Sequence, residues 1–179
     1  NQQLNAVDDE VFVGFALIDH DGTPDFAAGA VYDDTAQGGD AGSVLVFSGA
    51  TCARLLKLTD TGGATGDYLG YSVTALDDVN GDGTVDLAAG AIYDDTAVGT
   101  NSGSVVVFSG ADGAVLQRFT DPAALGTDLL GTALAAIGDL GGGGKPEILA
   151  GAEGAPLPEG QDAGKGLVFS FEADCDGDG

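Results

Sequence analysis

The residues best suited to chemistry are oxygen-bearing side chains in a nine-residue segment, 78–86, with the sequence DVNGDGTVD. Oxygen ligands at positions 1, 3 and 5, a glycine at position 6 and a backbone carbonyl at position 7 are typical of a loop that wraps a hard cation. Gly81 and Gly83 permit the positive φ values that bend such a loop. The candidate ligands are Asp78, Asn80, Asp82, Thr84 and Asp86.

Calcium is the ion that this loop predicts. Six or more oxygens at roughly 2.3–2.6 Å suit Ca²⁺, whereas Mg²⁺ requires a smaller and stricter octahedron. The alternative is an Asp-rich turn without metal, because Asp, Asn and Gly are common turn residues. We favour the ion, because clustered carboxylates repel one another unless a cation lies between them.

Three further segments resemble this loop in part. The segment 17–25 has Leu17 at position 1, and it predicts either a weaker calcium site completed by water or no site. Its candidate ligands are Asp19, Asp21, Thr23 and Asp25. The segment 139–147 retains two carboxylates beside Lys145 and predicts no metal. Near the end of the sequence, an acidic cluster lacks a final ligand and predicts weak binding; its members are Asp174, Asp176 and Asp178.

These loops belong to a repeat of 61 residues. DFAAGA at 25–30 returns as DLAAGA at 86–91 and EILAGA at 147–152. In the middle copy, apolar runs between stretches rich in Gly, Asp and Asn predict four short strands, at 70–76, 86–91, 104–109 and 115–120. Four strands per repeat are typical of a β-propeller blade. The fold prediction is therefore all-β, in one repeat domain over 1–179 with blades at about 8–68, 69–129 and 130–179.

The third copy lacks its outer strand, the equivalent of residues 116–120. Closed propellers have four to eight blades, so three blades are too few for a ring. The segment 2–7 is a candidate for the missing strand, from the same chain or from another one. Because an unpaired strand edge invites strand addition, we expect association with other chains, as a homo-oligomer or filament.

Composition excludes several classes of partner. The chain has 29 acidic residues and 5 Lys and Arg, for a formal net charge of −24. Nucleic acid binding needs a basic surface, and an anionic membrane repels an acidic one. There is no run of about 18 apolar residues, so we expect no membrane insertion. Since 44% of the residues are hydrophobic, the chain is expected to fold around a core. The first residue is not Met and no signal peptide is recognisable, which indicates a processed or excised chain.

No catalytic constellation stands out. His20 is the only histidine, and a turn residue is the favoured interpretation of it. The tetrapeptide YDDT occurs at 32–35 and 93–96, as a ligand-facing loop or, as we favour, a turn in which Asp caps backbone N–H groups. Cys52 and Cys175 fall within one residue of equivalent repeat positions. They predict a disulfide within the chain or between subunits, the alternative being two free thiols.

The repeat resembles the FG-GAP repeats of integrin alpha subunits and of many bacterial secreted proteins. Residues 69–73 are similar to the Phe-Gly segment, 78–86 to the calcium loop, 90–91 to the Gly-Ala-Pro segment and 103–110 to the Gly-x-Val-x-Val-Phe-x-Gly strand. The resemblance covers about residues 10–170. Four positions depart from the family pattern: Leu69 replaces its phenylalanine, and its proline is replaced by Val31, Ile92 and Glu153.

This resemblance implies a propeller, calcium in the loops between first and second strands, and a role in adhesion or recognition rather than catalysis. It also implies an extracellular or cell-surface location. The sequence is therefore interpreted as a calcium-stabilised module for adhesion, interaction or structure, with other protein chains or extracellular glycans as partners. The alternative is an accessory or targeting domain of a secreted hydrolase.

Overall fold

The computed structural model describes residues 13–156 and 164–171, and within these ranges it consists of strands and loops without any helix. The strands form three separate antiparallel sheets, in the orders β1-β2-β3-β4, β5-β6-β7-β8 and β11-β10-β9. The prediction of an all-β fold with blade-like sheets is confirmed. The strands are β1 (Val13–Ala16), β2 (Asp25–Ala30), β3 (Ser43–Phe47), β4 (Arg54–Leu58), β5 (Leu69–Ala75), β6 (Leu87–Ala91), β7 (Ser104–Phe108), β8 (Val115–Phe119), β9 (Leu130–Ala136), β10 (Ile148–Ala152) and β11 (Lys165–Phe169).

The middle sheet matches its predicted strands to within one residue at each end. Every residue of β6 and β7 is buried, whereas β8 is half-buried with Gln117 exposed. This gradient is expected when the central strands of a blade are covered on both faces and the outer strand lies at the surface. The described residues hold no helix with the length and apolarity needed to cross a membrane.

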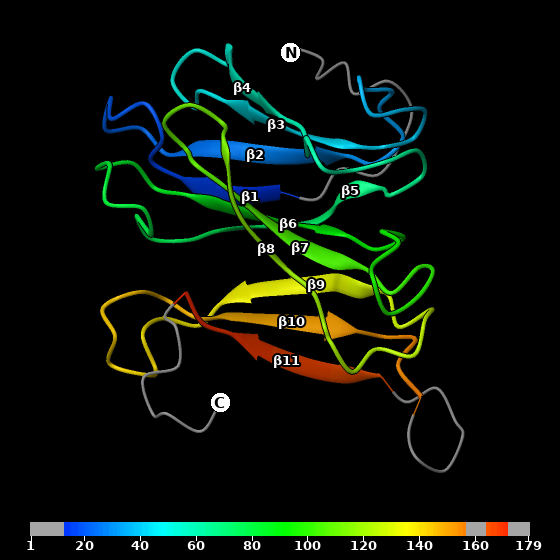
Figure 1. The fold of residues 1–179 in the computed structure, drawn as a ribbon. Coiled ribbons are helices and arrows are strands. Elements are labelled where there is room, and N and C mark those ends of the chain that lie inside the picture. The colour runs from blue at the N-terminus through cyan, green and yellow to red at the C-terminus, as the bar shows by residue number, and fades with distance from the viewer. Residues whose placement is uncertain (1–12, 157–163, 172–179) are drawn as a thin grey trace.

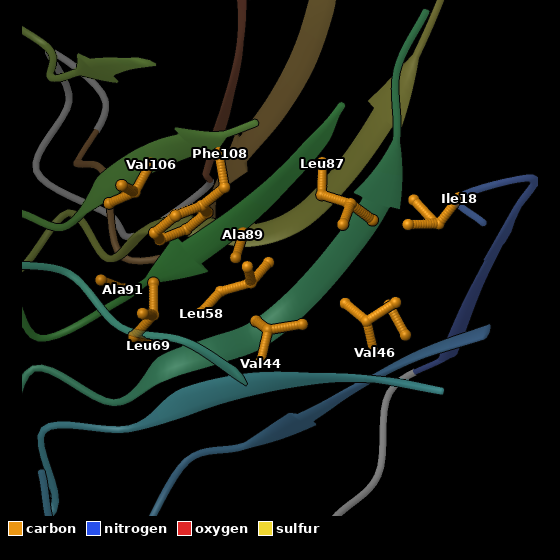
Figure 2. Close-up of a cluster of buried hydrophobic side chains, with 11 residues drawn as sticks. Ile18, Val44, Val46, Leu58, Leu69, Leu87, Ala89, Ala91, Val106 and Phe108 are labelled. Atoms are coloured by element: carbon orange, nitrogen blue, oxygen red, sulfur yellow. The ribbon is translucent and has the colours of Figure 1, made fainter. Parts of the chain in front are cut away.

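The three sheets, called blades one, two and three here, follow one another in chain order (Figure 1). Alternate side chains of β6 and β7 point to opposite neighbours, as the two-residue period of a strand requires. Val106 and Phe108 pack with Val44 and Val46 of blade one (Figure 2). On the other face, Val105 and Val107 pack in a second cluster with the three apolar side chains Leu130, Ile148 and Ala150 of blade three.

Blade three has three strands where the other two blades have four. Among the described residues, β11 pairs with β10 alone, so its outer edge is open, in agreement with the predicted loss of an outer strand. The segment 2–7 that we considered for this place lies outside the described residues. Cys175 also lies outside them, and Cys52 is exposed in the turn between β3 and β4, so the disulfide stays a prediction.

Candidate metal-binding loops

The candidate loops all connect the first and second strands of a blade. Each ends on an acidic residue at the start of the second strand: Asp25, Asp86 and Glu147. These three side chains are buried, unlike the other carboxylates of the loops. A buried carboxylate requires hydrogen-bond donors, and the loop backbone supplies them.

Asp86 joins its loop to a distant turn. Its Oδ2 accepts a hydrogen bond from the N–H of Val79 at 2.9 Å, and its Oδ1 accepts one from the N–H of Gly110 at 3.0 Å. Gly110 lies in the turn between β7 and β8, so one carboxylate fixes the relative position of the two connections. A predicted metal ligand therefore also has a structural role.

Asp25 repeats this arrangement in blade one. Its Oδ2 accepts from the N–H groups of Ile18 and Asp19, at 2.7 and 3.1 Å, and its Oδ1 accepts from Gly49 at 3.0 Å. Both oxygens thus face backbone donors. The same geometry in two copies shows that the 61-residue period governs contacts as well as strands.

The middle loop is closed by Asp78, whose carboxylate accepts hydrogen bonds from Gly81, Asp82 and Gly83 at 2.7–3.1 Å. Asp82 accepts from the N–H of Thr84 at 2.8 Å and from the Asn80 amide at 2.7 Å. All five predicted ligands of this loop therefore lie within one hydrogen-bonded turn or at its end.

The pKa values of the acidic residues reflect these surroundings. Burial raises the pKa of Asp86 above its ordinary value, although the N–H groups of Gly110 and Val79 oppose this, and the negative charge of Asp82 raises it further. The Asn80 amide and the N–H of Thr84 lower the pKa of Asp82. A cation beside the pair would favour the ionised form of both carboxylates.

In Asp25 the balance is reversed. Burial alone would raise its pKa, but the N–H groups of Gly49, Asp19 and Ile18 together hold the pKa of this carboxyl below its ordinary value. Asp25 is thus stabilised as an anion by the backbone of its own blade.

Carboxylate oxygens gather most tightly in the first loop. One oxygen from each of Asp19, Asp21 and Asp25 lies within 4.8 Å of the others, and no second group of three acidic, His or Cys side chains in the described part of the chain meets this spacing. Thr23, also predicted as a ligand, donates its N–H to Asp21 at 2.7 Å. The sequence had favoured the middle loop, where Asp78 instead faces the loop backbone.

The third loop closes without a trio of carboxylates. Asp139 accepts hydrogen bonds from Gly142, Gly143 and Gly144 at 2.6–3.0 Å. Glu147 accepts from Leu140 and Gly141, at 2.6 and 3.2 Å. Both acids are therefore directed at backbone donors. The absence of a metal here stays a prediction, as does binding by Asp174, Asp176 and Asp178, which lie outside the described residues.

His20 connects the first two loops. Its Nε2 donates a hydrogen bond to the carbonyl oxygen of Gly83 at 2.9 Å, and the side chain is exposed. The contact joins position 4 of one loop to position 6 of the next, so the two candidate sites are neighbours across a blade boundary. This fits the interpretation of His20 as a turn residue.

The repeated YDDT segments form turns. Asp34 and Asp95 accept hydrogen bonds from backbone N–H groups six residues further on, at 3.0 and 2.9 Å. The hydroxyls of Thr35 and Thr96 accept from the second residue after each, at 3.2 and 3.4 Å. The turn interpretation accounts for these four side chains.

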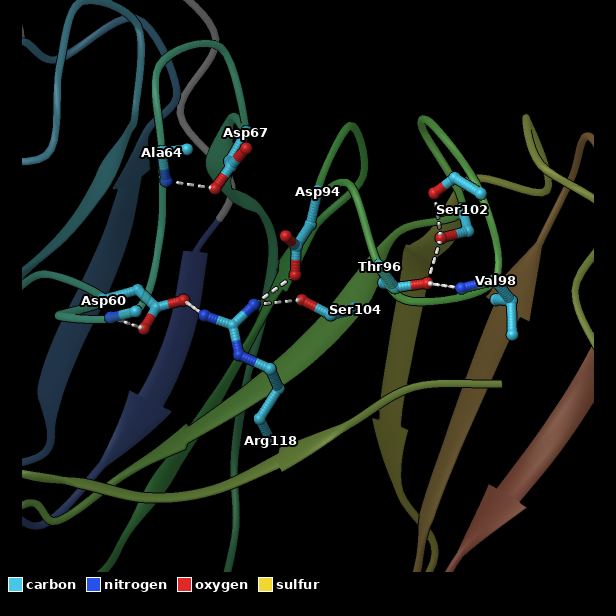
Figure 3. A network of polar contacts seen from close by, with 11 residues as sticks. Asp60, Ala64, Asp67, Asp94, Thr96, Val98, Ser102, Ser104 and Arg118 are labelled. Atoms are coloured by element: carbon cyan, nitrogen blue, oxygen red, sulfur yellow. Dashed lines mark hydrogen bonds and ion pairs between the residues drawn. The ribbon is translucent and has the colours of Figure 1, made fainter. Parts of the chain in front are cut away.

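Sequence reasoning missed an ion-pair network at the end of the blades opposite the metal loops (Figure 3). Arg118 on β8 pairs with Asp60 of blade one and with Asp94 of its own blade, and its Nη1 lies 3.1 Å from Ser104 Oγ. At the next blade boundary, Lys165 pairs with Asp121 and with Asp128 at 2.6 Å. Since Asp60 and Asp121 are 61 residues apart, the repeat contained a signal for the acids, although not for their partners.

Comparison with known proteins gives one informative similarity. The chain is 34% identical to human integrin alpha-6 over 111 residues, which is 59% of this chain. The matched part is 8% of the length of integrin alpha-6, so the chain spans a small fraction of that relative. No family model matches the chain.

Proposed function

We propose that the chain is an FG-GAP-type segment of a β-propeller that is stabilised by calcium and serves adhesion, interaction or structure without catalysis. The gathering of Asp19, Asp21 and Asp25 oxygens within 4.8 Å is the observation on which the proposal rests. The similarity to integrin alpha-6, an adhesion receptor chain by the resemblance described above, supports the same class. We also propose that residues 1–179 form one repeat domain, with the blade boundaries predicted above.

The donor sets fit a hard cation. Loops one and two offer carboxylate, amide and carbonyl oxygens and no sulfur, which is the donor chemistry that Ca²⁺ prefers. Bound calcium would neutralise clustered carboxylates at both loops. The chain's own residues then do the rest: Asp25 and Asp86 connect each loop to the following hairpin turn through backbone N–H groups. Calcium would therefore stabilise the connection between first and second strands.

Thermal unfolding with calcium and with a chelator tests the metal claim. Extracellular calcium modules have Kd values of about 10⁻⁴–10⁻³ M, so about 2 mM calcium should stabilise each site by roughly 0.6–1.8 kcal/mol. For a chain of this size, each kcal/mol corresponds to about 2–4 °C in Tm. If calcium-loaded and chelated samples unfold at the same temperature, the metal claim fails.

Two exposed ligands allow the sites to be separated. Asp21→Asn should reduce the calcium-dependent part of Tm for loop one, and Asp82→Asn should do so for loop two. Asp112→Asn is the matched control, because Asp112 is exposed and caps its own turn, with its Oδ1 2.9 Å from the N–H of Ala114. An equal loss of calcium response in the control would assign the effect to general charge rather than to the loops.

An extracellular or cell-surface location and partners among protein chains or extracellular glycans complete the proposal. Millimolar calcium outside cells would keep sites of this affinity largely occupied. Screening the purified chain against glycan and protein arrays, with and without calcium, addresses the partner directly.

A further inference from the structure

The boundary between blades depends on pairs of glycines. A Cβ added at Gly29 would overlap the carbonyl oxygen of Gly70, and one added at Gly90 would overlap that of Gly131. Gly29 and Gly90 lie on the second strand of a blade, and Gly70 and Gly131 on the first strand of the next blade. Each new blade therefore begins with its backbone lying directly on a glycine of the preceding blade.

A second glycine completes each boundary. Gly42 and Gly103 have φ values of 80° and 77°, and a Cβ at either position would overlap the backbone of Leu69 or Leu130. Both glycines form parallel bridges with those leucines. One hydrogen bond supports each bridge: the Leu69 N–H donates to the Ala41 carbonyl and the Leu130 N–H to the Ser102 carbonyl, both at 3.0 Å.

The incoming strand has requirements of its own. Gly70 and Gly131 have φ values of 95° and 98°, which side chains rarely adopt. A Cβ on Gly70 would also lie 2.6 Å from the Ser43 carbonyl oxygen and 3.0 Å from the Gly29 Cα. The leucine before each of these glycines is buried in the core between blades. An apolar residue followed by glycine is thus the chemistry that both boundaries accept.

Blade three carries the same two receiving glycines. Gly151 and Gly164 lie 61 residues after Gly90 and Gly103, and Gly164 has a φ of 68°. A Cβ on Gly151 would meet only Thr132 Oγ1 at 3.4 Å and atoms of Ala133 at 3.5 Å or more, which are in its own blade. Both glycines line an open groove of about 540 Å³, called the blade-three groove here.

The sheet face beside this groove is apolar and exposed. Leu149 is 40% exposed and Val168 is 57% exposed, whereas the equivalent Ala88 and Val107 of blade two are fully buried against blade three. In the described residues, this face is therefore the uncovered counterpart of two faces that are covered elsewhere in the chain.

Two residues of the groove differ from their equivalents. Glu153 replaces Val31 and Ile92, and Lys165 replaces a serine, but the Lys165 ammonium is directed at Asp121 and Asp128. Its charge is thus already paired. The receiving surface itself is the backbone of Gly151 and Gly164, which these replacements do not alter.

We propose that the blade-three groove docks a further blade of this same repeat, through a first strand that begins with an apolar residue followed by glycine. The proposal goes beyond the calcium-stabilised module, because it uses none of the metal ligands. Its basis is that the chain contains the same joint twice, at Gly29 and Gly70 and at Gly90 and Gly131.

A labelled peptide of residues 68–76, YLGYSVTAL, is the probe, because it is the first strand of blade two and carries Leu69 and Gly70. It should bind the 179-residue chain saturably, as measured by fluorescence anisotropy at fixed calcium. A peptide in which Gly70 is replaced by valine should bind at least about tenfold more weakly, because its side chain would enter the groove wall.

Two protein variants give opposite expectations. Gly151→Ala places a methyl group where the strand carbonyl must lie, so binding should fall at least about tenfold, while ordinary contacts around the new Cβ leave Tm nearly unchanged. Gly166→Val restores the valine found at Val44 and Val105, so this variant should bind at least as tightly as the unmodified chain. Amide signals of Gly151, Gly164 and Gly166 should shift in NMR spectra on titration with the peptide.

Three results would overturn the proposal. These are the absence of saturable binding up to millimolar peptide, equal binding of the Gly70→Val peptide or of the Gly151→Ala chain, and shifts confined to blades one and two. Binding that survives Gly151→Ala would assign the interaction to the apolar face around Leu149 and Val168, without the glycine joint.

Discussion

Replacing Arg118 with methionine should strongly destabilise the chain, because one guanidinium joins two blades. Its partners are Asp60, in the loop between β4 and β5, and Asp94, in the loop between β6 and β7 (Figure 3). Both carboxylates are buried. Methionine keeps much of the side-chain length and removes the charge, so the substitution isolates the ionic contribution.

The magnitude follows from burial. Removing one partner of a buried ion pair costs about 3–5 kcal/mol, because the remaining charge has neither water nor a counter-ion. The Arg118 side chain is 26% exposed, so water reaches part of the site and we expect the lower end, about 3 kcal/mol. In a chain of this size that corresponds to a fall in Tm of about 6–12 °C.

The repeat supplies a matched control. Lys57 lies 61 residues before Arg118 and pairs with Asp33 at 2.6 Å, but these side chains are 35% and 29% exposed. Lys57→Met should therefore cost at most about 1 kcal/mol. Arg118→Lys should recover part of the loss, because Lys165 holds the equivalent acids Asp121 and Asp128 at the next boundary.

Urea unfolding at fixed calcium, followed by far-UV circular dichroism and by tyrosine fluorescence, measures these free energies. Coincident transitions from the two probes would justify a two-state treatment. If Arg118→Met and Lys57→Met differ by less than about 1 kcal/mol, the reasoning from burial is wrong.

Two further predictions concern blade contacts and pH. Gly90→Ala should cost about 1–3 kcal/mol, because its Cβ would overlap the Gly131 carbonyl oxygen, whereas Gly151→Ala should be nearly neutral; equal falls in Tm would contradict this. Burial raises the pKa of Asp94 to about 6, opposed by the Ser104 hydroxyl and assisted by the carboxylates of Asp67 and Asp95. A carboxyl whose pKa is higher in the folded state contributes stability that is complete below its unfolded pKa of 3.8 and is lost as pH rises through about 6. Urea titrations between pH 4 and pH 7 should therefore show Asp94→Asn with a flatter profile than the unmodified chain, by up to about 3 kcal/mol, and parallel profiles would refute the assignment.

The repeat made much of the fold predictable. Strand positions in blade two were correct to within one residue, because each strand is a short apolar run between Gly- and Asp-rich turns. The burial of β6 and β7 on both faces also followed from their continuous apolar composition. These are local patterns, and the sequence records them directly.

The ion pairs of Arg118 were not predictable in this way. Asp60 lies 58 residues from Arg118, and nothing in the sequence near either residue indicates their contact. The two residues meet only because blade two packs against blade one, with the loop after β4 lying beside the outer strand β8.

The sequence by itself determined the period, the all-β class and the kinds of ligand atoms in each loop, because these depend on residue type and spacing. Only the tertiary structure decided that the carboxylates of Asp19, Asp21 and Asp25 gather more closely than those of the middle loop, since this depends on which way each side chain turns. It also decided that Gly151 and Gly164 border an open groove. The reason is that the closeness of two backbones is a property of packed blades, which a repeated motif does not encode.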